Sequence, residues 1–122
     1  MWRLLLLALA APAQASPMDA VVAAWEAGDW ARARALLRPL ALRGDPAAGT
    51  LLGVMAARGL GGPAEPAVAA AWYLRAAASG HVPAQLALAD AYRRGEGVAR
   101  DPARAAAIET MLSEGSRGAV RR

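Results

Sequence analysis

Apolar residues recur at spacings of three and four along most of the 122-residue chain, which is the period of amphipathic helices. Prolines, glycines and acidic residues interrupt this pattern and predict where each helix begins and ends. The predicted helices cover residues 18–27, 30–42, 46–58, 66–79, 82–94 and 102–114. Pro39 falls inside the second helix, where we expect it to kink the helix or split off its last turn. Because alanine is abundant while β-branched and aromatic residues are scarce, the sequence predicts an all-α protein.

One glycine-containing loop occurs twice, at a period of 36 residues from Gly59 to Gly95. A fixed period of this size is typical of a solenoid, in which each unit buries its apolar side against its neighbours. The sequence therefore predicts three antiparallel helix pairs within residues 16–114, with units of about 18–43, 44–79 and 80–114. The positions expected to maintain the repeat are Leu52, Gly53, Gly59, Gly61, Trp72, Gly80, Leu88, Tyr92, Gly95, Gly97 and Asp101.

Acidic residues stand immediately before the prolines that open three of the helices. We expect Asp45, Glu65 and Asp101 to cap these helices, because a carboxylate can accept hydrogen bonds from the free amides of the first turn. Gly59 and Gly95 are expected to end the preceding helices in the left-handed conformation.

Three stretches of the chain closely resemble Sel1-like repeats, which are relatives of tetratricopeptide repeats. They are Ala48 to Gly61 (AGTLLGVMAARGLG), Ala69 to Gly80 (AAAWYLRAAASG) and Ala84 to Asp101 (AQLALADAYRRGEGVARD). The resemblance extends over about residues 18–114, loosely in the first unit. It implies helix pairs stacked into a right-handed superhelix that serves as a scaffold for other proteins.

Some positions depart from the Sel1-like pattern. They are Ala56 in place of the tyrosine kept at Tyr92, Gly62 in place of the valine kept at Val98, and Ala89 in place of the glycine kept at Gly53. The final helix carries Ile108-Glu109 where the preceding unit has Trp72-Tyr73. We therefore expect the final helix to belong to a terminal unit.

The two ends of the chain differ from the repeats in composition. Residues 1–15 combine Arg3, a short apolar run and the small-residue pattern Ala13-Gln14-Ala15, which predicts a cleaved secretory signal. The mature protein is then expected to be periplasmic or secreted, and not integral to a membrane. Residues 115–122 contain three arginines and are expected to form a disordered basic tail.

The sequence contains no signature of catalysis or of metal binding. It has no cysteine and a single histidine, His81, so neither a thiolate site nor a histidine cluster can form. Cysteine-rich Sel1-like proteins have been associated with penicillin binding and β-lactam hydrolysis, and without cysteine we do not transfer a hydrolase activity of this kind. We expect a protein without enzymatic activity, metal or cofactor.

The expected function is protein–protein interaction in the cell envelope, with a peptide or protein segment bound in the concave groove of the solenoid. Trp72 and Tyr73 point about 100° apart on a helix, so with Trp72 in the core Tyr73 is expected to be half-exposed in the groove. The other candidate binding residues are Arg93, Arg94, Arg100 and Arg104.

A net charge of +4 supports an alternative, a cationic binder of anionic glycan or lipid at the envelope surface. Nucleic acid is not an expected partner, because export would separate the two. A second copy of the chain, joined through the ends of the repeat stack, is a further expected partner.

Overall fold

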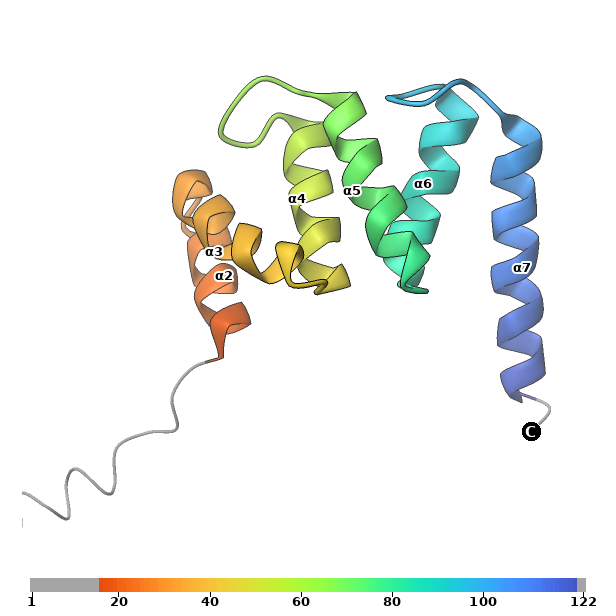
Figure 1. Cartoon of the computed structure of the whole chain (residues 1–122), viewed down its shortest axis with the longest axis horizontal. Coiled ribbons are helices and arrows are strands. Elements are labelled where there is room, and N and C mark those ends of the chain that lie inside the picture. The colour runs from red at the N-terminus through yellow and green to blue at the C-terminus, as the bar shows by residue number, and fades with distance from the viewer. Residues whose placement is uncertain (1–15, 121–122) are drawn as a thin grey trace, which may run out of the picture.

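The computed structural model describes residues 16–120, and within this part the protein consists of helices and connecting loops (Figure 1). The helices are α2 (Pro17–Glu26), α3 (Trp30–Leu42), α4 (Pro46–Arg58), α5 (Pro66–Ala78), α6 (Val82–Arg94) and α7 (Pro102–Val120). The predicted all-α class is confirmed. The predicted signal sequence, residues 1–15, lies outside the described residues.

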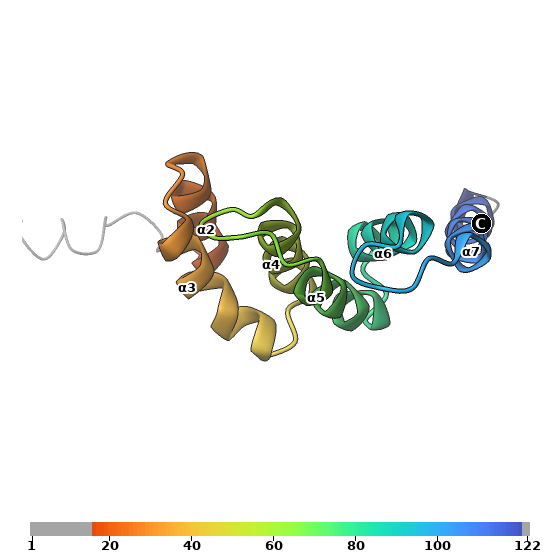
Figure 2. The same ribbon diagram turned by 90° about the horizontal axis from the view of Figure 1, so that it is seen from above.

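The helices form a curved stack. Figure 1 shows them side by side in chain order, and each helix packs against the next. Seen from above in Figure 2, α3 and α5 lie on one side of the stack, while α2, α4 and α6 lie on the other. The backbone of α4 also approaches that of α6, whereas the backbones of α3 and α5 stay apart and only side chains join them, as in the hydrogen bond from Arg75 to the Leu42 carbonyl. The stack is therefore closed on the α4–α6 side, its concave face, and splayed on the α3–α5 side, its convex face.

The two copies of the loop have the same three-dimensional structure, including their hydrogen bonds. The amide of Glu65 donates to the carbonyl of Ala56 at 2.8 Å, and 36 residues later the amide of Asp101 donates to the carbonyl of Tyr92 at 2.8 Å. Gly59 ends α4 with φ of 65°, and its counterpart Gly95 ends α6 with φ of 71°. The predicted left-handed ends are confirmed at both positions.

The central glycine of each loop allows the loop to rest on the start of an earlier helix. Gly97 has φ of 75°, and a methyl group there would overlap the backbone of Pro66 at the start of α5. Gly61 has φ of 79°, and a methyl group there would come within 2.6 Å of the Cβ atom of Trp30 at the start of α3. Each loop thus ties its own unit to the unit before it.

Two of the three expected acidic caps are formed. The Asp45 carboxylate accepts from the amides of Ala47 and Ala48 at 3.0 and 3.2 Å, and Asp101 accepts from the amide of Arg104 at 3.0 Å. The prediction for Glu65 was wrong, since its side chain makes no capping hydrogen bond. The longer side chain of glutamate is a poorer match for the first-turn amides than that of aspartate.

The core places Tyr73 inside and Trp72 at its edge, contrary to the expectation from sequence. Tyr73 is only 7% exposed, while Trp72 is half-buried against the neighbouring apolar cluster. Tyr73 points inward because Gly53 of α4 leaves a space for its ring, and a methyl group at Gly53 would overlap that ring. The expected core positions Leu52 and Leu88 are confirmed, at 5% and 6% exposure.

One helix boundary also differs from the prediction. Helix α7 continues to Val120, so the disordered tail expected from residue 115 was wrong over residues 115–120. Gly115 does not adopt a positive φ, and without a left-handed residue or a proline nothing stops the helix there. Helix α3 covers Trp30–Leu42 as predicted and continues past Pro39, so its last turn is not split off.

Candidate binding surfaces

The concave face contains a hollow of about 430 Å³ between α4, α5 and α6. We call it the concave hollow. Its floor is formed by Tyr73 and by small side chains, which keep the three helices close together. It is lined by Val54, Ala57, Arg58, Pro66, Ala69, Ala70, Tyr73, Ala87, Asp90, Ala91, Arg94 and Glu96.

Charges of both signs surround the concave hollow. The Arg94 Nε atom lies 3.2 Å from the Asp90 Oδ1 atom on the same helix, while Arg58 stands on α4. Burial raises the pKa of the Tyr73 phenol, Arg58 lowers that pKa in part, and Asp90 and Glu96 raise it. The hollow therefore has a neutral phenol at its floor and both cations and anions at its rim.

All four arginines proposed as binding residues have partners within the chain, and Arg93, Arg100 and Arg104 do not line the concave hollow. Arg93 pairs with Glu109 of α7, and this hydrogen-bonded carboxylate raises the pKa of Arg93. The Arg100 Nε atom donates to the carbonyl of Arg93 at 3.1 Å. The Arg104 guanidinium lies 5.2 Å from the centre of the Tyr92 ring and donates to its hydroxyl at 3.3 Å. Arg93 and Arg104 thus fasten α6 to α7, and Arg100 fastens the connecting loop to the end of α6.

The fourth arginine, Arg94, is the one that lines the concave hollow. The structure therefore brings Tyr73 and Arg94 together and directs the other three candidates elsewhere. Arg58, Asp90 and Glu96 join them there, and sequence reasoning missed these three residues. Arg58 could have been found from the sequence, because it lies 36 residues before Arg94 and likewise ends its helix.

The convex face carries a furrow between α3 and α5, and its floor is α4. Toward the loop end of the helices lies a hollow of about 310 Å³, which we call the loop-end hollow. It is lined by Arg34, Arg38, Leu52, Met55, Ala56, Gly61, Gly62, Pro63, Glu65, Val68 and Trp72. Sequence reasoning missed this furrow entirely.

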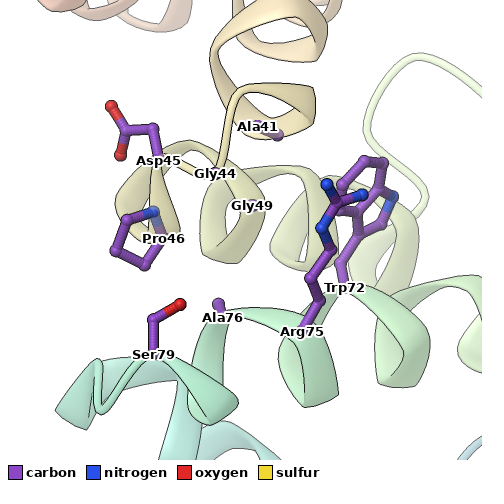
Figure 3. A pocket seen from close by; sticks show the side chains of 9 residues that line it. All are labelled: Ala41, Gly44, Asp45, Pro46, Gly49, Trp72, Arg75, Ala76 and Ser79. Carbon is purple, nitrogen blue, oxygen red and sulfur yellow. The ribbon is translucent and has the colours of Figure 1, made fainter.

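A smaller cavity of about 50 Å³ lies on the other side of Trp72, near Asp45 and Ser79 (Figure 3). The guanidinium of Arg75 lies 6.0 Å from the centre of the Trp72 ring and donates to the carbonyl of Leu42 at 3.3 Å. Figure 3 shows this guanidinium beside the Trp72 ring. Arg75 thus bridges α5 and the end of α3 and closes the furrow at this point.

Within residues 16–120 no three His, Asp or Glu side chains gather closely enough to hold a metal ion. His81 precedes α6 at the N-cap position without a capping hydrogen bond from its side chain. Among the described helices, none has the length and apolar character needed to cross a bilayer.

Solved structures share this fold. One is a Sel1 repeat protein from Oxalobacter formigenes, with a TM-score of 0.72 and 27% identity over 78% of this chain. Another is c5321, a protective antigen present in uropathogenic Escherichia coli strains and displaying an SLR fold, with a TM-score of 0.66 and 34% identity over 70% of this chain. The chain has a Sel1-like repeat fold. The predicted α-solenoid of antiparallel helix pairs is thereby confirmed.

The match covers 39% of the Oxalobacter protein and 18% of the Escherichia coli antigen, so this Sel1-like chain spans less than half of either relative. No family model matches the chain, and neither does any curated protein. The Sel1-like fold is in general a repeat-based scaffold for protein interaction.

Proposed function

We propose that this protein is a non-catalytic adaptor of the cell envelope that binds a peptide or protein segment of a partner in the concave hollow. The observation that carries the proposal is the hollow itself, which is open on the concave face and framed by three helices. A partner segment placed there would contact two consecutive repeat units at once, which is how solenoids use their concave surfaces.

The lining of the concave hollow suits an extended segment. Five alanines keep its walls low, so that a peptide backbone can approach the helices closely. Arg58 and Arg94 offer donors to carbonyls or carboxylates, while Asp90 and Glu96 offer acceptors to amides or cations. A segment with charges of both signs would match this rim better than a purely anionic surface would.

The envelope location rests on the predicted signal at residues 1–15. Expression of the full chain with a C-terminal tag, followed by N-terminal sequencing of the periplasmic fraction, tests it. A mature chain beginning at Ser16 is expected. A full-length chain recovered from the cytoplasm would contradict the proposed location, and would leave binding in the concave hollow to be decided by its own experiment.

Binding in the concave hollow is tested by obstructing it. Ala57 is exposed and lines the hollow, while Ala71 is exposed on α5 outside any described hollow, so the same substitution can be compared at both. Crosslinked capture from envelope extract should recover a specific protein with the parent chain and with Ala71→Trp, but not with Ala57→Trp. Equal recovery with both variants, or recovery of only glycan or lipid, would refute the proposal.

A further inference from the structure

The second and third repeat units fill the same position of the repeat with different side chains. In the third unit, the Tyr92 ring is 8% exposed and lies under the guanidinium of Arg104. The counterparts of these residues, 36 positions earlier, are Ala56 and Val68. The second repeat unit thus lacks both the aromatic ring and the guanidinium that covers it.

The loop-end hollow lies where this ring is missing, since both Ala56 and Val68 line it. The counterparts of Leu52 and Trp72 in the next unit, Leu88 and Ile108, pack with Tyr92 in a continuous apolar cluster. The hollow is therefore an open version of a site that the next unit fills with its own tyrosine. Its inner walls, Leu52, Met55 and Trp72, are apolar and suited to a flat ring.

Two cations stand at the mouth of the loop-end hollow on helix α3. Arg38 is exposed, and no carboxylate of the described residues lies within ion-pairing distance of it. Arg34 is half-buried and donates to the carbonyl of Leu60 at 3.1 Å, which holds its guanidinium beside the loop. Glu65 is the acidic member of the lining and has no ion-pair partner among the described residues.

We propose that the loop-end hollow is a second binding site, which takes the aromatic side chain of a partner peptide with an acidic residue beside it. The ring would occupy the space that Tyr92 occupies in the next unit, against Leu52, Met55 and Trp72. The neighbouring carboxylate would pair with Arg38 and Arg34, the two cations that line the hollow. This site lies on the convex face, so it is independent of the concave hollow and of the function proposed for it.

The charge at the mouth favours an acidic partner over a basic one. Arginine binds carboxylate through paired hydrogen bonds, which would fix the position of the acidic residue beside the ring. Without a ring in the hollow the remaining attraction would be a surface ion pair, which is weak. The ring is therefore required for its buried area, while the acid adds orientation and a smaller part of the affinity.

The probe is a capped pentapeptide with a central tyrosine between two glutamates, titrated by calorimetry and by NMR of the Ala56 methyl group. Two companion peptides replace the tyrosine by alanine or both glutamates by glutamine. We expect binding of the first peptide, no detectable binding of the alanine peptide, and weaker binding of the glutamine peptide. Binding of the alanine peptide as strong as that of the tyrosine peptide would overturn the proposal.

Substitutions in the chain test where the pentapeptide binds. Ala56→Tyr supplies the missing ring and should abolish binding while the helical circular dichroism is kept. Arg38→Gln should weaken binding about two- to five-fold, as removal of an exposed ion pair does, while Arg32→Gln on the same helix should leave it unchanged. If Ala56→Tyr fails to fold, the comparison of Arg38→Gln with Arg32→Gln still tests the site. Equal affinities of these two variants for the pentapeptide would refute it.

One further comparison distinguishes binding on the convex face from binding on the concave face. Ala57→Trp obstructs the concave hollow and should not affect the pentapeptide. A peptide lost with Ala57→Trp but retained with Ala56→Tyr would lie in the concave hollow, which overturns this second site and supports the first. A dimer of the parent chain that Ala56→Tyr dissociates would identify a second copy as the occupant and would equally overturn the proposal.

Discussion

Two glycines on the same helix should respond to the same substitution in opposite directions. Gly49 and Gly53 are both buried on α4. A methyl group at Gly49 would meet Ala76 and Trp72 at 3.8 Å, an ordinary van der Waals contact, whereas a methyl group at Gly53 would overlap the buried Tyr73 ring. Alanine therefore fits at the first position and not at the second.

The magnitudes follow from two opposing terms. Replacing glycine by alanine inside a helix stabilises it by about 0.8 to 1 kcal/mol, and this term is shared by both variants. Overpacking a filled core costs about 1 to 3 kcal/mol, and only Gly53→Ala incurs it. We expect Gly49→Ala to be more stable than the parent by up to about 1 kcal/mol. The two variants should differ by the overpacking term, about 1 to 3 kcal/mol.

Urea unfolding followed by circular dichroism measures both free energies, and the melting temperatures should separate by about 4 to 8 °C for each kcal/mol in a domain of this size. The double variant Gly53→Ala with Tyr73→Ala removes the overlap, so the cost of the first change should disappear in that background. Equal stability of Gly49→Ala and Gly53→Ala would refute the placement of the Tyr73 ring.

Three other outcomes are expected. Leu88→Ala should cost about 2 to 5 kcal/mol in urea unfolding because it empties a buried leucine site, and an unchanged midpoint would contradict the packing of α6. Because burial raises the pKa of the Tyr73 phenol in the folded state, its contribution to stability is complete below about pH 10 and is lost as the pH rises through the folded pKa. Tyr73→Phe should therefore reduce the decrease in melting temperature at alkaline pH. An unchanged decrease would show that another group causes it. Glu109→Gln removes the partner of Arg93 and should speed amide exchange in α7 at low salt but not at high salt, whereas equal effects at both would rule out a charge contribution.

The helix starts were predictable because their signals are local. Asp45-Pro46 and Asp101-Pro102 combine a capping acceptor with a residue whose missing donor costs nothing at the first helical position. The loop glycines were predictable for the same reason, since Gly59 and Gly95 adopt a conformation that few other residues tolerate. Such signals depend on a few neighbouring residues and not on the rest of the fold.

The orientation of Tyr73 could not be predicted from its own helix. Trp72 and Tyr73 are adjacent, and either could have faced the core; the choice was made by Gly53 on another helix, which leaves room for one ring and not the other. Clustering in sequence was equally misleading for Arg93 and Arg104, whose partners include Glu109 across the helix interface. The furrow between α3 and α5 arises from the curvature of the whole stack, which no short stretch of sequence encodes.

Unequal duplication could lengthen this array only at certain crossover points. A crossover between the loops at Gly59 and Gly95 would place the sequence of α6 directly before that of α5, so the methyl group of Ala89 would take the position of Gly53 and overlap the ring of Tyr73. A crossover between Gly44 and Gly80 would copy α4 and α5 together and keep the glycine with its ring. The unit by which such a gene can grow is therefore the intact helix pair, and not an arbitrary window of the same length.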